Sequence, residues 1–241
     1  MSDAEPTFHP RPRLLVSVRA PDEALTALDA GADLIDAKDP ERGALGALSP
    51  EIVRAIVARV GGRAVTSAVA GDGTGREIAA AVAAMAETGV DFIKIAVTAA
   101  GDAALEKAAS RAPGRVIGVL FAEDGAAQDG LIEDAPGRLA AAGFCGAMID
   151  TSGKNGVALA ALLPAPRLAA FVAACRARGL MSGLAGSLAL SDIPVLAALN
   201  PDYLGFRGGL CRASDRRQGL DGVRVTQAVA ALRAGLRADA A

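Results

Sequence analysis

The lysines of this sequence are few enough to be singled out as candidate chemical groups. Lysine occurs only at positions 38, 94, 107 and 154, so arginine supplies nearly all of the basic charge. Arginine cannot lose its proton at working pH, and a chain that otherwise prefers it can keep lysine where a deprotonatable amine is needed. Lys38, Lys94 and Lys154 each lie in or just after an apolar, strand-like segment. These three are therefore candidates for a reactive amine.

The segment 32–46, ADLIDAKDPERGALG, holds the first of these lysines beside a carboxylate. It predicts a short buried strand over 34–37, followed by a glycine-rich loop. Because successive side chains of a strand point to opposite faces, Asp36 and Lys38 share one face. Charged groups at the end of an apolar strand are costly unless they are paired. The pattern fits a structural ion pair as well as a catalytic one, and the scarcity of lysine favours catalysis.

The composition argues against several classes of function. The chain has 241 residues, a net charge of −2, 3% aromatic residues and no tryptophan, so no basic, aromatic-rich surface for nucleic acid is expected. Its one histidine, His9, lies in a polar, proline-rich start, which argues against histidine triads and ordinary histidine metal sites. No apolar run approaches the ~18 residues of a membrane span. The three cysteines form no CxxC pair, which predicts free thiols and a cytoplasmic protein.

An alternation of apolar strands and helices runs through the whole chain. Eight strands are predicted, at 14–18, 34–37, 64–69, 91–96, 116–121, 147–150, 180–185 and 203–206. Helices are predicted after them, at 21–30, 50–60, a segment ending at 88, 102–111, 136–142, 166–178, 191–199 and 222–238. This repeat of roughly 25 to 35 residues predicts a single (β/α)8 TIM barrel over 13–241, with a flexible tail over 1–12. A doubly wound open sheet is the alternative.

The ionisable residues fall where such a barrel keeps its active site, at the carboxyl ends of the strands. Asp36 and Lys38 come from the second strand, Lys94 from the fourth, Asp150 from the sixth, and Lys154 follows it. Alternate strands share a layer of side chains, and the cost of burying a lysine among helices favours an inward Lys94. Two nearby ammonium groups lower each other's pKa, and burial lowers it further, so one amine would be neutral as Schiff-base formation requires. The neighbouring carboxylates could then transfer protons. For Lys154, a solvated loop lysine is the alternative.

Two glycine-containing turns predict an anion site. Gly186 and Ser187 follow the seventh strand, and Arg207, Gly208 and Gly209 follow the eighth, which are the usual phosphate-binding positions of this fold. Glycine allows backbone N–H groups to approach an oxyanion closely, although it is also ordinary in turns. The two turns together predict a phosphorylated ligand.

With these residues in view, the chain resembles the (5-formylfuran-3-yl)methyl phosphate synthase family of methanofuran biosynthesis. The matching segments, spread over about 14–211, are LLVSV, GADLIDAKDPERGALGA, TSAVAGD, DFIKIAV, AMIDTSGKNG, GLAGSL and GFRGGLC. The resemblance implies a barrel that condenses two glyceraldehyde 3-phosphate molecules, with loss of one phosphate and water. It implies Lys38 as the Schiff-base lysine, Lys94 as the proton acceptor, and Asp36, Asp150 and Lys154 as supporting acid–base residues.

The resemblance implies no metal and no organic cofactor. The arginine- and alanine-rich composition and the N-terminal tail favour a bacterial member, for which we hypothesise one-carbon metabolism with a methanofuran analogue. The loop 123–130 corresponds to none of the family's segments.

Two other classes of function remain open at this stage. One is a different phosphosugar enzyme on the same fold, either a class I aldolase or an isomerase. The other is a non-catalytic barrel that binds a phosphorylated metabolite. In every case the expected partner is a small phosphorylated triose or a related molecule, with no nucleic acid and no membrane, and with a homo-oligomer as an open alternative to a monomer.

Overall fold

The computed structural model describes residues 12–238 except 72–74, 98–100, 129 and 153–156. Eight parallel strands close into a barrel in which each strand pairs with the next and β8 pairs with β1. The strands are β1 (Arg13–Val18), β2 (Leu34–Ala37), β3 (Val65–Gly71), β4 (Phe92–Ala96), β5 (Val116–Phe121), β6 (Gly146–Asp150), β7 (Met181–Ala185) and β8 (Tyr203–Phe206). The predicted TIM barrel is therefore confirmed.

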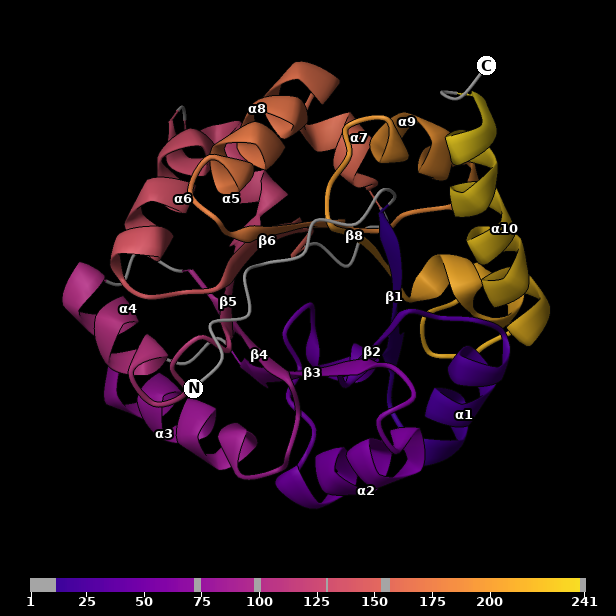
Figure 1. Ribbon diagram of the computed structural model, residues 1–241, viewed down its shortest axis with the longest axis horizontal. Helices are drawn as coiled ribbons and strands as arrows, with labels where there is room; N and C mark the ends of the chain where they lie inside the picture. Colours follow the sequence, from indigo (N-terminus) through magenta and orange to yellow (C-terminus); the bar gives the residue numbers. More distant parts are fainter. Residues whose placement is uncertain (1–11, 72–74, 98–100, 129, 153–156, 239–241) are drawn as a thin grey trace.

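Helices surround the ring of strands, and α10 lies beside α1 where the barrel closes (Figure 1). The α-helices are α1 (Pro21–Asp29), α2 (Pro50–Val60), α3 (Gly75–Ala86), α4 (Asp102–Ala109), α5 (Ala122–Ala127), α6 (Leu131–Ala141), α7 (Leu159–Leu162), α8 (Ala165–Arg176), α9 (Ile193–Ala197) and α10 (Gly222–Ala238). The described residues also form four 3₁₀ turns: η1 (Pro40–Arg42), η2 (Leu190–Asp192), η3 (Gly208–Leu210) and η4 (Arg212–Ser214). No helix among the described residues has the length and apolarity needed to cross a membrane.

The region after β5 differs from the sequence-based prediction. The segment expected to be a loop over 123–130 is largely the helix α5, and the helix expected to begin near Pro136 begins at Leu131. Proline is most often found at the first position of a helix, which is why the sequence predicts a start at Pro136. In the structure Pro136 is buried inside α6. Packing of the α6 face against the sheet outweighs the backbone hydrogen bond that proline cannot make.

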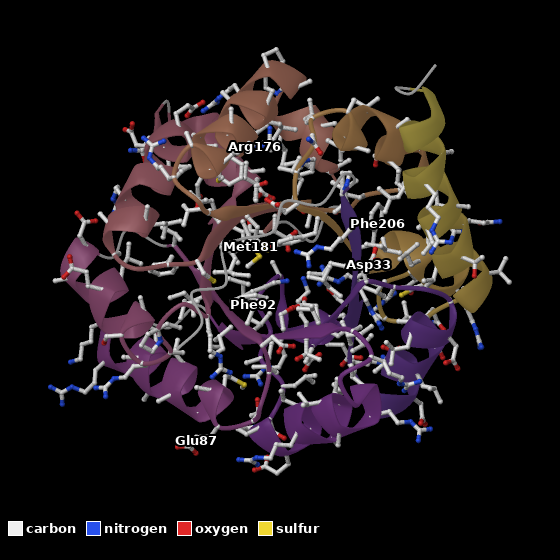
Figure 2. All side chains as sticks on the ribbon, in the orientation of Figure 1. Asp33, Glu87, Phe92, Arg176, Met181 and Phe206 are labelled. Carbon is white, nitrogen blue, oxygen red and sulfur yellow. The ribbon has the colours of Figure 1, made fainter. Side chains whose placement is uncertain are left out.

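Two apolar cores hold the barrel together. The larger lies between the strands and the helices, and the smaller fills the barrel itself with side chains that alternate with those facing outward. Phe92 and Met181 lie within the ring of strands, whereas Glu87 lies outside it (Figure 2). The ring of Tyr203 occupies the space beside Gly183, where a Cβ would overlap it. In the described part of the chain, the interior of the barrel is thus a filled core.

Candidate active site

A cavity of about 330 Å³ opens at the carboxyl ends of the strands. Each strand contributes a lining residue, in chain order Leu15, Asp36, Val69, Lys94, Val119, Met148, Ala185 and Gly205. The segments after β2, β6, β7 and β8 contribute further lining residues. Asp36, Lys38, Lys94 and Asp150 all line this one cavity, so the inward orientation expected of Lys94 is confirmed. Lys154 lies outside the described residues.

The buried end of the cavity holds an ion pair between Lys94 and Asp36. The Lys94 Nζ atom is 2.9 Å from the Asp36 Oδ1 atom, and the two residues are 2% and 1% exposed. Ser67 donates a hydrogen bond of 2.6 Å to the same oxygen, and Ser17 donates one of 3.1 Å to Oδ2. These partners meet because Ser17, Asp36 and Ser67 are directly paired across β1, β2 and β3.

Ser17 and Ser67 are functional neighbours that the sequence did not single out. Ser17 lies in the largely apolar β1 and Ser67 follows Thr66 in β3, and hydroxyl side chains are unremarkable in such strands. They could be found only from the strand register, because the pairing of β1, β2 and β3 shows that both hydroxyls reach one carboxylate. With Lys94 they supply three donors to Asp36, which offsets much of the cost of burying its charge.

The surroundings of this pair perturb both pKa values. Burial lowers the pKa of Lys94, the attraction of Asp36 opposes that shift, and the positive charge of Lys38 adds to it. For Asp36, burial acts to raise the pKa, but Lys94, Lys38 and the Ser67 hydroxyl bring it below the ordinary value. Asp36 is therefore ionised at neutral pH, while Lys94 holds its proton less tightly than a lysine in water.

A second pair, Lys38 and Asp150, lies nearer the mouth. The Lys38 Nζ atom is 3.4 Å from the Asp150 Oδ2 atom, and both side chains are 11% exposed. The backbone of Lys38 donates to the Val18 carbonyl at 2.9 Å, and Asp150 Oδ1 accepts the Thr151 N–H at 2.8 Å. Each lysine is therefore paired with a carboxylate from a different strand. Lys38 is the more accessible of the two amines.

The Arg207 side chain does not fit the phosphate-binding role expected of it. Its five N–H groups all donate within the protein: Nε to the Arg216 carbonyl, Nη1 to the Ser17 carbonyl and Glu23, and Nη2 to Glu23 and the Gln218 carbonyl. The guanidinium therefore has no donor left for a ligand. We correct the expectation: this side chain fastens the end of β8 to β1 and α1.

The turns after β7 and β8 also line the cavity. Ser187, Leu188, Gly208 and Gly209 line it, and no acceptor within the described part of the chain takes their amide hydrogens. The two turns are in close contact, since a Cβ on Gly209 would collide with the Leu188 carbonyl oxygen. N–H groups without an acceptor at the wall of a cavity are suited to binding an anion.

The described residues contain no cluster of three or more His, Cys, Asp or Glu side chains that could hold a metal ion. Among the described residues, the cavity is lined by two lysines, three aspartates, two arginines and several hydroxyl groups, together with the turns after β7 and β8.

Comparison with known proteins places this site in a family. The 4-HFC-P synthase family model matches residues 14–229, which include every site residue named above. A Methanopyrus kandleri (5-formylfuran-3-yl)methyl phosphate synthase is 38% identical over 226 residues, covering 87% of this chain and 93% of that protein. The chain belongs to this family. A Methylorubrum extorquens protein, which carries the same synthase name as a provisional assignment, is 77% identical over the full length of both chains.

Solved structures agree with the fold assignment. The phosphoribosyl anthranilate isomerase of Thermus thermophilus superposes with a TM-score of 0.64 at 19% identity, covering 92% of this chain and 98% of that one. A 3-hexulose-6-phosphate synthase gives a TM-score of 0.60 at 18% identity, covering 91% and 99%. At these identities the likeness establishes the barrel alone. That the protein is an enzyme follows from its membership of the synthase family.

Proposed function

We propose that this protein condenses two molecules of glyceraldehyde 3-phosphate into (5-formylfuran-3-yl)methyl phosphate, through a Schiff base on Lys38. The observation that carries the proposal is the pair of lysine–carboxylate contacts in one cavity, Lys38 with Asp150 and Lys94 with Asp36. The family's curated name describes this product. The balance of the reaction is two triose phosphates converted into one furan phosphate, one phosphate and two waters.

Lys38 is the better placed nucleophile because it is nearer the mouth and less buried than Lys94. In the proposed first step Asp150 accepts a proton from Lys38, and the neutral amine attacks the carbonyl carbon of one triose phosphate. The C–N bond forms, the carbonyl oxygen leaves as water, and an imine remains. Its positive charge acidifies the hydrogen on the neighbouring carbon.

Lys94 suits the next proton transfer. Burial lowers its pKa, so it can exist as a neutral base closer to working pH than an ordinary lysine. Removal of the acidified proton gives an enamine whose carbon attacks the aldehyde of the second triose phosphate. Elimination of one phosphate and loss of two further waters then yield the aromatic furan. Hydrolysis of the imine takes back the water that was released when the imine formed, and it frees Lys38. The amide groups after β7 and β8 support binding of one substrate phosphate.

The product belongs to the biosynthesis of methanofuran or an analogue of it, and we place the reaction in the cytoplasm. The free thiols Cys145, Cys175 and Cys211 support a reducing compartment.

Borohydride trapping tests the proposal. The wild type, incubated with glyceraldehyde 3-phosphate and reduced, should gain one triose adduct on Lys38 by peptide mass spectrometry, while near-ultraviolet absorbance of a furan grows in the unreduced sample. Lys38→Ala should lose both signals, and Lys94→Met should keep the adduct but form the furan at least a hundredfold more slowly. Lys107→Ala, which removes an exposed lysine of α4, is the control and should behave as wild type.

Two other outcomes of this experiment would favour the alternative functions. An adduct without furan absorbance would support a class I aldolase. The absence of any adduct and any furan would remove the covalent mechanism and favour a non-catalytic barrel.

A further inference from the structure

Arg216 is a second arginine at the cavity, nine residues after Arg207 in the chain. It lines the cavity from the segment that follows η4. It packs closely against Gly208, since a Cβ added to that glycine would lie 3.6 Å from the Arg216 Cβ. From there its Nη2 atom donates a hydrogen bond of 3.1 Å to the Gly43 carbonyl, in the loop after β2. The Arg216 side chain therefore crosses from the β8 side of the cavity to the β2 side.

The hydrogen-bonding state of Arg216 is the opposite of that of Arg207. Arg207 places all five of its N–H groups on protein acceptors. For Arg216, the described residues provide an acceptor for one of the five N–H groups, and this acceptor is the Gly43 carbonyl. Its Nε atom is buried and meets no acceptor in that part of the chain. A buried donor without an acceptor is costly, so this position is best explained by an acceptor that a ligand brings.

Among the described residues, Arg216 has no carboxylate partner at the cavity. Within the described residues, three of the four cations that line the cavity have one, because Lys38 pairs with Asp150, Lys94 with Asp36 and Arg207 with Glu23. Asp215 also lines the cavity and is adjacent to Arg216 in sequence.

Asp215 is itself occupied by a different arginine. Its carboxylate is 3.0 Å from the Arg217 Nη2 atom, and this hydrogen bond holds the pKa of Asp215 below its usual value. Arg216 is thus the cavity-lining cation for which the described residues provide no ion pair.

The backbone of η4, just before Arg216, has an unusual conformation. Ala213 and Ser214 are consecutive non-glycine residues with φ of 52° and 55°, a conformation that side chains disfavour. Arg224 fastens the segment by donating to the Gly209 carbonyl at 2.9 Å and to the Ser214 hydroxyl at 3.1 Å. Strain of this kind, held by surrounding contacts, is found where a protein must present a group at a fixed place.

We propose that Arg216 binds the phosphate of the second glyceraldehyde 3-phosphate molecule, on the β2 side of the cavity, while the amide groups of the β7 and β8 turns bind the phosphate of the first. This inference rests on the proposed condensation, which requires two phosphorylated molecules in one site. The planar guanidinium, with Nε and a terminal nitrogen side by side, is suited to two parallel hydrogen bonds to a phosphate. A cavity of about 330 Å³ lies between the two groups of donors.

Calorimetric titration with glycerol 3-phosphate, an unreactive analogue, counts the phosphate sites without requiring turnover. The wild type should bind two molecules and Arg216→Met should bind one. Arg216→Lys should keep the second site at reduced affinity, because it keeps the charge but not the paired donors. Arg212→Met is the matched control: Arg212 is exposed, lies in the same segment and does not line the cavity, so two molecules should bind.

Steady-state rates of furan formation give the second readout. Arg216→Met should raise the triose phosphate concentration for half-maximal rate by roughly ten- to a hundredfold, the range for one lost charge-assisted contact. Far-ultraviolet circular dichroism melts should show both Arg216 variants folded, since the hydrogen bond that they lose among the described residues is the single one to Gly43.

The results separate the inference from the function on which it rests. Two bound molecules and an unchanged half-maximal concentration in Arg216→Met would overturn the inference and leave the condensation standing. A wild type that forms no furan, yet loses one bound glycerol 3-phosphate on the Arg216→Met change, would overturn the condensation while supporting Arg216 as a phosphate ligand.

Discussion

At the scale of single residues, the charge state of Lys94 depends on its immediate neighbours. Three charged groups act on it, since Asp36 and Asp150 raise its pKa and Lys38 lowers it, while burial lowers it most strongly. The contact of 2.9 Å with Asp36 is the closest of these interactions, and it limits how far burial lowers the pKa of Lys94. The pair positions a base and tunes it at the same time.

Removing the Asp36 charge should therefore shift the pH dependence of the reaction. In Asp36→Asn the main group that raises the pKa of Lys94 is gone, so Lys94 should become neutral at lower pH. We expect the acidic limb of the kcat/KM profile to move down by about one pH unit or more, together with a lower maximum. Asp29→Asn, at an exposed carboxylate of α1, is the control and should leave the profile in place. An unmoved limb in Asp36→Asn would argue against Lys94 as the base.

At the scale of elements, the turns after β7 and β8 depend on each other. Gly209 allows the η3 turn to reach the Leu188 carbonyl, and Gly186, at φ of 117°, leaves room for Thr151 after β6. Arg207 then fastens the end of β8 to Glu23 of α1, across the seam where β1 meets β8. Close backbone packing between the two turns, together with the hydrogen bond from Arg224 to the Gly209 carbonyl, thus holds this part of the cavity wall.

A methyl group at Gly209 should separate the two turns. The new Cβ would collide with the Leu188 carbonyl oxygen, which is backbone and cannot swing aside. We expect Gly209→Ala to weaken binding of inorganic phosphate by about tenfold, in keeping with one or two lost hydrogen bonds to a charged ligand. Gly219→Ala is the matched control, since a Cβ there meets nothing within 4 Å. Equal phosphate affinity in the two variants would show that the turns do not form the cradle.

At the scale of the whole molecule, the protein carries one tyrosine, and it lies inside the barrel. Tyr203 is 1% exposed, and its hydroxyl meets no hydrogen-bond partner among the described residues. Burial raises its pKa well above the ordinary value of 10.0, with the negative charge of Asp36 adding to the shift. Tyrosinate can therefore form readily only when the barrel opens.

The raised pKa of Tyr203 should make the free energy of unfolding depend on pH in the alkaline range. Because the folded state holds the phenolic proton more tightly, the contribution of Tyr203 to stability is complete below pH 10 and falls as the pH rises above it, by about 1.4 kcal/mol per pH unit. Urea unfolding from pH 8 to 11, followed by circular dichroism, should show Tyr203→Phe at least as stable as wild type at pH 8, with its advantage growing above pH 10. A difference between the two proteins that stays constant with pH would contradict this account.

The order and position of the strands could be predicted from the sequence because they depend on local patterns. β2, β5 and β8 begin and end where their apolar runs do, and α2 spans the predicted 50–60. The same local reasoning placed Asp36, Lys94 and Asp150 at strand ends that face one cavity. It missed α5 and α7 after β5 and β6, where short helices depend on the surfaces that cover them.

The sequence by itself therefore determined the barrel and the lysines and carboxylates at its mouth, since strand periodicity and residue type are properties of short segments. Only the tertiary structure decided which carboxylate pairs with which lysine, because each pair joins residues that are far apart in the chain. Register across β1, β2 and β3 likewise brings Ser17 and Ser67 to Asp36. It also decided that Arg207 is fully bonded, whereas the described residues accept one hydrogen bond from the Arg216 side chain. Arg207 meets Glu23 at a separation of 184 residues, and no local pattern reveals a hydrogen bond between partners so distant in the chain.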